Sequence, residues 1–227
     1  MNGNNKGLGA VTDFATGLEE MALVASGVVG WEEMERIRFL LNEIGEQVAR
    51  GVPEPDDRAR AGALFRHLRC TGPERYQPRG SFRLNEVALA QFGMEPAAMG
   101  NCLGLTVLYN VLARRLGLRV SSIHMERAFD TGPHVFSLLH LVGRKVDIEN
   151  ILPHGFDYRG HLGNPDREEW NDRELVADIY LSRGNEWFDA REWEKAEASY
   201  DRALLFNPRY EKAHLNKMMA RSQLDRG

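Results

Sequence analysis

Apolar residues in the first half of the chain recur three or four positions apart, which is the spacing of one helix face. Residues 31–52 show this pattern most regularly, with glutamates in the first turn, where the helix dipole favours acids, and Pro53 directly after. A second helix is expected from Asp56 or Asp57, and a short third one at residues 84–92. The first half of the chain is therefore predicted to be mainly helical.

The next predicted helix, at residues 101–116, has a broad apolar face and is followed by Gly117, a residue typical of helix ends. We expect this helix to be buried centrally, because it has few polar positions to turn toward water. Short runs that favour strands come after it, with Gly143-Arg144 as a hairpin turn. The expected strands are residues 119–124, 134–142 and 145–148. Helices followed by an antiparallel sheet predict an α+β fold.

Two stretches rich in glycine and proline, residues 71–81 and 153–171, are expected to be loops. The chain then becomes purely helical, with a pair at residues 174–189 and 193–206 and a last helix from about residue 210. This organisation predicts a partly flexible N-terminal segment, a core, a linker and a helical module. Their expected bounds are residues 1–30, 31–160, 161–173 and 174–227.

The helical pair carries small and aromatic residues at a fixed spacing. They are Gly184, Trp187, Ala196, Tyr200, Ala203 and Pro208. This spacing resembles one unit of the tetratricopeptide repeat, in which small residues let two antiparallel helices pack closely. A single unit cannot form the long groove of such arrays. The module is therefore expected either to buttress the core or to dock a partner.

Composition and charge favour a folded protein that binds neither nucleic acid nor membrane. Of the 227 residues, 43% are hydrophobic and 27% are charged, the net charge is −4, and no dense Lys/Arg block occurs. The longest apolar stretch near the N-terminus, residues 21–29, is too short to cross a bilayer, and no signal pattern precedes it. Two cysteines are too few for a disulfide framework, so we expect a reducing, cytoplasmic location.

Cys102 stands at the first turn of the predicted central helix, directly after Gly100 and Asn101. Free backbone N–H groups and the positive end of the helix dipole favour a thiolate there, and the thiolate is the attacking form of cysteine. The same N–H groups can bind the oxyanion of a tetrahedral intermediate. We therefore predict that Cys102 is a nucleophile, whereas Cys70 lacks this context and is expected to serve packing.

A cysteine nucleophile also needs a base and an acid that orients the base. His134 opens a predicted strand after a Thr-Gly-Pro turn, and Asp147 lies on the next strand of the hairpin. The predicted hairpin brings these two side chains onto neighbouring strands. His134 is therefore the expected base and Asp147 the expected acid.

The residues around these three positions resemble the transglutaminase-like superfamily, and in particular its bacterial SirB-type branch, whose members often end in tetratricopeptide repeats. The matching segments are Gly100-Asn101-Cys102 with the leucine-rich helix after it, His134-Val135-Phe136, Gly143, and Asp147-Ile148-Glu149-Asn150. The resemblance implies a papain-like α+β core with a Cys-His-Asp triad. It also implies acyl transfer, or amide or peptide hydrolysis, through a thioester.

The acid and the oxyanion hole each leave alternatives open. The Asp-x-x-Asn pattern selects Asp147, which we prefer, whereas counting from the turn glycine selects Glu149. The sequence shows no evident tryptophan or tyrosine near Cys102 to complete the oxyanion hole. The candidates for that part of the site are Gly100, Asn101 and Gln91.

The expected function is thus acyl transfer or hydrolysis on a protein or peptide substrate, without a cofactor or a metal. His124, His154 and His161 together with Asp157 match no standard spacing of metal ligands. The competing hypothesis is a non-catalytic or regulatory protein that uses the core and the helical module as a docking surface.

Overall fold

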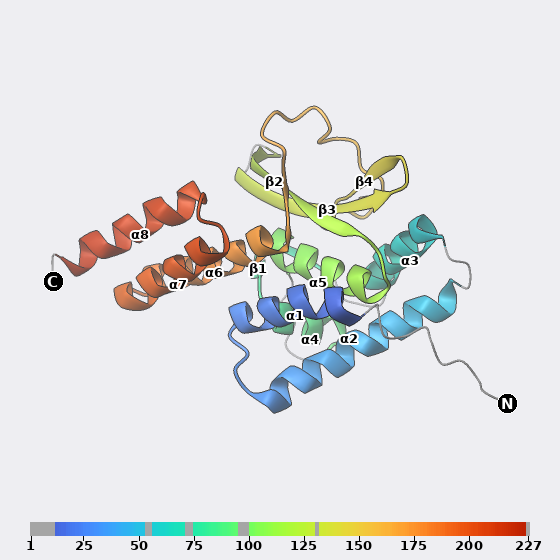
Figure 1. The fold of residues 1–227 in the computed structure, drawn as a ribbon, viewed down its shortest axis with the longest axis horizontal. Helices are drawn as coiled ribbons and strands as arrows, with labels where there is room; N and C mark the ends of the chain where they lie inside the picture. The colour runs from blue at the N-terminus through green and yellow to red at the C-terminus, as the bar shows by residue number, and fades with distance from the viewer. Residues whose placement is uncertain (1–11, 53–55, 71–74, 95–99, 130–131, 226–227) are drawn as a thin grey trace.

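The computed structural model describes residues 12–52, 56–70, 75–94, 100–129 and 132–225. Within these ranges the chain forms eight helices, a short strand beside the central helix, and a four-stranded antiparallel sheet (Figure 1). The helices are α1 (Thr12–Ser26), α2 (Trp31–Gly51), α3 (Asp57–Cys70), α4 (Leu84–Gln91), α5 (Cys102–Arg115), α6 (Asp172–Asp189), α7 (Trp193–Phe206) and α8 (Glu211–Leu224). The strands are β1 (Tyr76–Ser81), β2 (Val120–Ala128), β3 (Gly132–Leu141), β4 (Arg144–Ile148) and β5 (Glu168–Trp170).

Helix α5 is the centre of the molecule, as its broad apolar face predicted. All residues from 103 to 113 are buried. One side of α5 packs against β3 and β2 of the sheet, and the other sides contact α1, α2, α3 and α4 (Figure 1). The molecule is therefore layered, with the sheet over α5 and the N-terminal helices beneath it.

The sheet has the order β4-β3-β2-β5, and all neighbouring strands are antiparallel. The hairpin between β3 and β4 pairs Leu141 with Arg144, so its turn is Val142-Gly143 and not the predicted Gly143-Arg144. Gly143 has a φ of 76°, a left-handed conformation that glycine adopts without steric cost. This one-residue difference fixes which side chains of β4 face those of β3.

Three elements lie where the sequence predicted none. Residues 12–26, expected to belong to a partly flexible segment, form α1, whose buried side chains pack against α5 and α6. The expected loop at residues 71–81 contains β1, and the expected linker supplies β5. Both strands are short and polar, so they lack the alternating apolar pattern that reveals half-buried strands.

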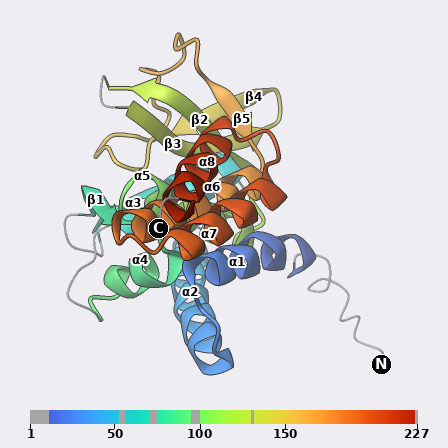
Figure 2. The same ribbon diagram turned by 90° about the vertical axis from the view of Figure 1, so that its left-hand side faces the viewer.

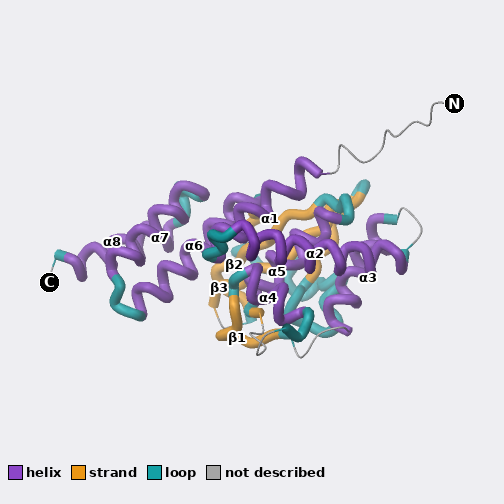
Figure 3. Tube along the Cα trace, turned by 90° about the horizontal axis from the view of Figure 1, so that it is seen from below, coloured by secondary structure: helices purple, strands orange, loops and turns teal. Residues whose placement is uncertain are grey.

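Helices α6, α7 and α8 extend from one end of the molecule, opposite to α3 (Figure 3), and Figure 2 views them end-on. A Cβ atom on Gly184 would lie 2.3 Å from the ring of Tyr200, so a small residue is required where α6 meets α7. The module also shares one hydrophobic core with α1 and α5, and Arg183 donates a hydrogen bond to the carbonyl of Ala25 at 2.8 Å. It therefore buttresses the core through α6.

No helix in the described part of the chain combines the length and the apolar character needed to cross a membrane.

Candidate active site

Cys102 is the first residue of α5 and is a free, half-buried thiol. Asn101 caps the helix, because its side-chain oxygen accepts a hydrogen bond from the backbone N–H of Gly104 at 3.0 Å. The backbone N–H of Asn101 donates to the carbonyl of Ser81 in β1 at 3.0 Å. Strand β1 therefore lies along the start of α5 and holds the cysteine at the helix end.

His134 lies near the start of β3 and is only 5% exposed. Its Nε2 atom lies 2.7 Å from Oε2 of Glu149. Burial alone would lower the pKa of His134, but hydrogen bonds with Cys102 and Glu149, together with their charges, raise it to about 9. The imidazole therefore stands between the thiol and a carboxylate and carries a proton at neutral pH.

The carboxylate that is hydrogen-bonded to His134 is Glu149, the alternative acid, and not the preferred Asp147. Asp147 instead accepts two hydrogen bonds from the guanidinium of Arg167, at 2.8 and 3.0 Å. The reason is the register of the hairpin, which pairs Asp147 with Leu138. Since Leu138 lies four residues beyond His134, Asp147 is on the order of 13 Å away along the strand, whereas Glu149 is two residues closer.

Glu149 is fully buried, and a second histidine holds it from another side. Nε2 of His161 lies 3.2 Å from the same Oε2 atom that bonds to His134. Burial favours the neutral acid, but the hydrogen bonds from both histidines and the charge of His134 lower the pKa of Glu149 below its ordinary value. His161 was not predicted to contact the acid, because it comes from the long loop after β4.

Gly155 fixes the backbone at Glu149. Its carbonyl accepts a hydrogen bond from the Glu149 N–H at 2.8 Å, and a Cβ atom at this position would lie 1.9 Å from the Glu149 carbonyl oxygen. One residue further on, Asn150 donates from Nδ2 to Ser137 at 2.9 Å and to Thr106 at 3.2 Å. The acid is therefore anchored to the sheet and to α5 by backbone and side chains together.

His134, Glu149 and His161 also offer the two-histidine, one-carboxylate ligand set of catalytic zinc sites. Their ligand atoms lie within 4.8 Å of one another. Ligands of a tetrahedral zinc ion stand about 3.4 Å apart, because each lies about 2.1 Å from the metal. The 2.7 Å separation of His134 and Glu149 is shorter and is a hydrogen-bond distance, so the arrangement fits a hydrogen-bonded chain better than a metal centre.

The residues expected near the oxyanion have unequal roles. The side-chain oxygen of Asn101 is already bonded to Gly104, and its backbone N–H is already bonded to Ser81. Gly100 forms β-bridges with both ends of β1. Gln91 is buried at the end of α4. The backbone N–H of Cys102 has no hydrogen-bond acceptor among the described residues and points from the free end of α5.

Tyr76 is a site residue that the sequence did not indicate. Burial and the negative charges of Cys102 and Glu149 together raise the pKa of this tyrosine. The phenol is therefore protonated at neutral pH, and the bridge between Tyr76 and Gly100 places the start of β1 beside the residues that precede Cys102. Tyr76 was missed because it lies 26 positions before Cys102, in a segment that was expected to be a loop and that forms β1.

Comparisons of the chain with protein-family models, with curated proteins and with solved structures gave no match. The relation to the transglutaminase-like superfamily and to the tetratricopeptide repeat remains a hypothesis drawn from the residues.

Proposed function

We propose that this protein is a thiol acyltransferase or hydrolase of the transglutaminase-like type, with Cys102 as nucleophile, His134 as base and Glu149 as the orienting acid. The observation that carries the proposal is the position of the buried His134 ring between Cys102 and the Glu149 carboxylate. Nucleophile, base and acid in hydrogen-bonded order are what thiol acyl chemistry requires. A papain-like core and a tail related to the tetratricopeptide repeat are part of the same proposal.

In the proposed reaction the thiol proton of Cys102 has already passed to His134, which is protonated at neutral pH, and the sulfur attacks the carbonyl carbon of an amide. The tetrahedral intermediate collapses when His134 returns the proton to the leaving amine, which leaves a thioester on Cys102. Water or a second amine then attacks the thioester, and the thiol is released. Glu149 holds the ring with Nε2 toward itself, so the other ring nitrogen, Nδ1, faces the sulfur.

The oxyanion of the intermediate has two candidate donors. Among the described residues the backbone N–H of Cys102 has no acceptor, and Tyr76, which bridges to Gly100, has a protonated phenol. Two donors aimed at the developing negative charge are the usual device for such intermediates. Asn101 is the weaker candidate, because its N–H is already bonded to Ser81.

The alternative, a non-catalytic docking protein, is favoured by a different observation. Helices α7 and α8 expose four large apolar side chains, more than a helix facing only water needs. They are Leu205, Leu215, Met218 and Met219, which are between 47% and 69% exposed. Such a surface suits a protein partner, and it shares no residue with the candidate active site.

The proposal is tested with p-nitrophenyl acetate, an activated ester that acylates reactive thiolates. The full-length protein should release a burst of about one equivalent of p-nitrophenolate per chain, and mass spectrometry should place the acetyl group on Cys102. Cys70→Ala should retain the burst and Cys102→Ala should lose it. Equal acetylation of both cysteines, or no burst at neutral pH, would leave only the docking function.

A further inference from the structure

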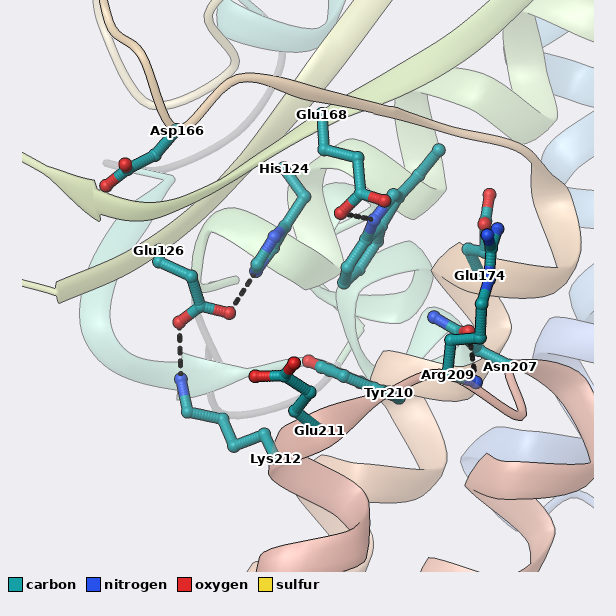
Figure 4. Close-up of a pocket in the computed structure, with 11 residues that line it drawn as sticks. His124, Glu126, Asp166, Glu168, Glu174, Asn207, Arg209, Tyr210, Glu211 and Lys212 are labelled. Carbon is teal, nitrogen blue, oxygen red and sulfur yellow. Dashed lines mark hydrogen bonds and ion pairs between the residues drawn. The ribbon is translucent and has the colours of Figure 1, made fainter.

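A pocket of about 280 Å³ lies where the helical module meets the sheet (Figure 4). Its walls come from β2, from the segment around β5, and from the start of α8. The pocket shares no residue with the candidate active site. In the strand register His124 pairs with Val135 and Met125 pairs with His134, so the histidine of the pocket and the histidine of the active site point to opposite faces of the sheet.

The lining of this pocket is strongly acidic. Five carboxylate side chains line it against two basic ones, Arg209 and Lys212. Lys212 is already paired with Glu126 at 3.2 Å. Glu168 accepts a hydrogen bond from the Trp170 indole at 3.0 Å, which leaves its charge uncompensated. Asp166 is paired with Arg127 at 3.1 Å, so the surplus of negative charge lies on Glu168, Glu174 and Glu211, which form no ion pair with a described residue.

A buried imidazole at the pocket wall provides a second, independent observation. His124 is 4% exposed, and its ring stacks on Trp170 with centroids 3.9 Å apart and planes 5° apart. No described residue forms a hydrogen bond with the ring, and the Glu126 carboxylate, 4.0 Å from Nε2, lies beyond hydrogen-bond distance. Burial lowers the pKa of His124, so at neutral pH the ring is neutral and can accept a hydrogen bond from a ligand.

The floor of the pocket consists of two buried aromatic side chains whose polar groups already have hydrogen-bond partners. Trp170 is 2% exposed, and Tyr210 packs edge-on against it at 5.4 Å. The Tyr210 hydroxyl donates a hydrogen bond to Asp178 at 2.7 Å. An aromatic floor with acidic walls is suited to an organic cation, whose methylene groups contact the rings while its charged end meets the carboxylates. It is poorly suited to an anion.

We propose that this pocket binds an alkylammonium ion, held by Glu168 and Glu211 and by the free nitrogen of His124. The ammonium group has three N–H donors, and the pocket supplies acceptors from β2, from the segment at β5 and from α8. Two sources share this chemistry, namely a free polyamine and a lysine side chain of a polypeptide. The site is separate from Cys102, so its occupation does not depend on the proposed catalysis.

The experiment follows the indole N–H signal of Trp170 by NMR in low salt, with the full-length protein labelled with ¹⁵N and the signal assigned by its loss in Trp170→Phe. Spermidine and N-acetyl-lysine methylamide are titrated separately. A saturable shift with the lysine derivative supports a polypeptide source, and a shift with spermidine alone supports a polyamine. Both results support the site.

Glu168→Gln and Glu211→Gln should each weaken binding about tenfold, because each removes a charge next to the ammonium group. Glu211 is exposed, so Glu211→Gln is expected to fold, and it tests the site even if Glu168→Gln does not fold. Glu194→Gln is the matched control, since it removes the same charge from an exposed position on α7 outside the pocket. The proposal is overturned if neither amine shifts the signal up to about 10 mM, if both pocket variants bind like the control, or if inorganic phosphate binds instead.

Discussion

Replacing Glu149 with glutamine is expected to slow acetylation of Cys102 on the order of 100-fold or more, because the charge that stabilises protonated His134 is lost. Glutamine can still accept a hydrogen bond from the ring, so the effect measures the charge of the acid. The pseudo-first-order rate with p-nitrophenyl acetate provides the measurement. It should be taken under conditions where circular dichroism shows the variant to be folded.

Asp147→Asn is the matched control, since it removes the same charge from a carboxylate two positions away. It should leave the acetylation rate within about threefold of wild type, because Asp147 has no contact with His134. It should instead lower the free energy of unfolding by about 2 kcal/mol, because the Arg167 guanidinium loses its partner. A larger loss of rate in Asp147→Asn than in Glu149→Gln would mean that Asp147, and not Glu149, is the acid that orients His134.

Gly104→Ala is expected to lower the free energy of unfolding by about 3 kcal/mol, although alanine favours helices. The added Cβ would lie 2.3 Å from the Ser81 carbonyl oxygen and 2.9 Å from Val87. A backbone carbonyl cannot move out of the way as the end of a flexible side chain can. The substitution must therefore push β1 and α4 away from the start of α5, which would also displace Tyr76 from Cys102.

Gly45→Ala is the control for Gly104→Ala. Gly45 is a buried glycine within α2, but no neighbouring atom lies within 4 Å of its added Cβ. Removing the conformational freedom of glycine should raise the free energy of unfolding by about 0.5–1 kcal/mol. Urea unfolding followed by circular dichroism measures both variants. Equal stability of the two would mean that β1 does not pack tightly on α5.

The sequence predicted the helices and the sheet strands with strong periodic patterns, and it predicted Cys102 and His134 as the centre of the site. The acid could also have been chosen from the sequence. A two-residue turn at the hairpin places residue 149 nearer to His134 than residue 147 in either register, so counting pairs across the strands was more informative than the Asp-x-x-Asn pattern.

The remaining residues could not be inferred from local patterns, because long-range packing brings them to their sites. Tyr76 comes from a short polar strand before the cysteine, and His161 comes from the loop after the acid. Likewise, the acidic pocket joins β2 to the first residues of α8, which lie more than 80 positions apart in the chain. Only the folded arrangement reveals these juxtapositions.

The central claim, that His134 and Glu149 activate Cys102, is tested most directly by alkylation with iodoacetamide, measured for both cysteines by peptide mass spectrometry. At about pH 6 an ordinary cysteine is mostly unreactive thiol. Half-buried Cys102 should nevertheless react at least about tenfold faster than exposed Cys70. The excess should shrink as the pH rises through about 9, where His134 loses its proton, and it should be absent in His134→Ala. Faster alkylation of Cys70 throughout, or an unchanged ratio in His134→Ala, would contradict the account.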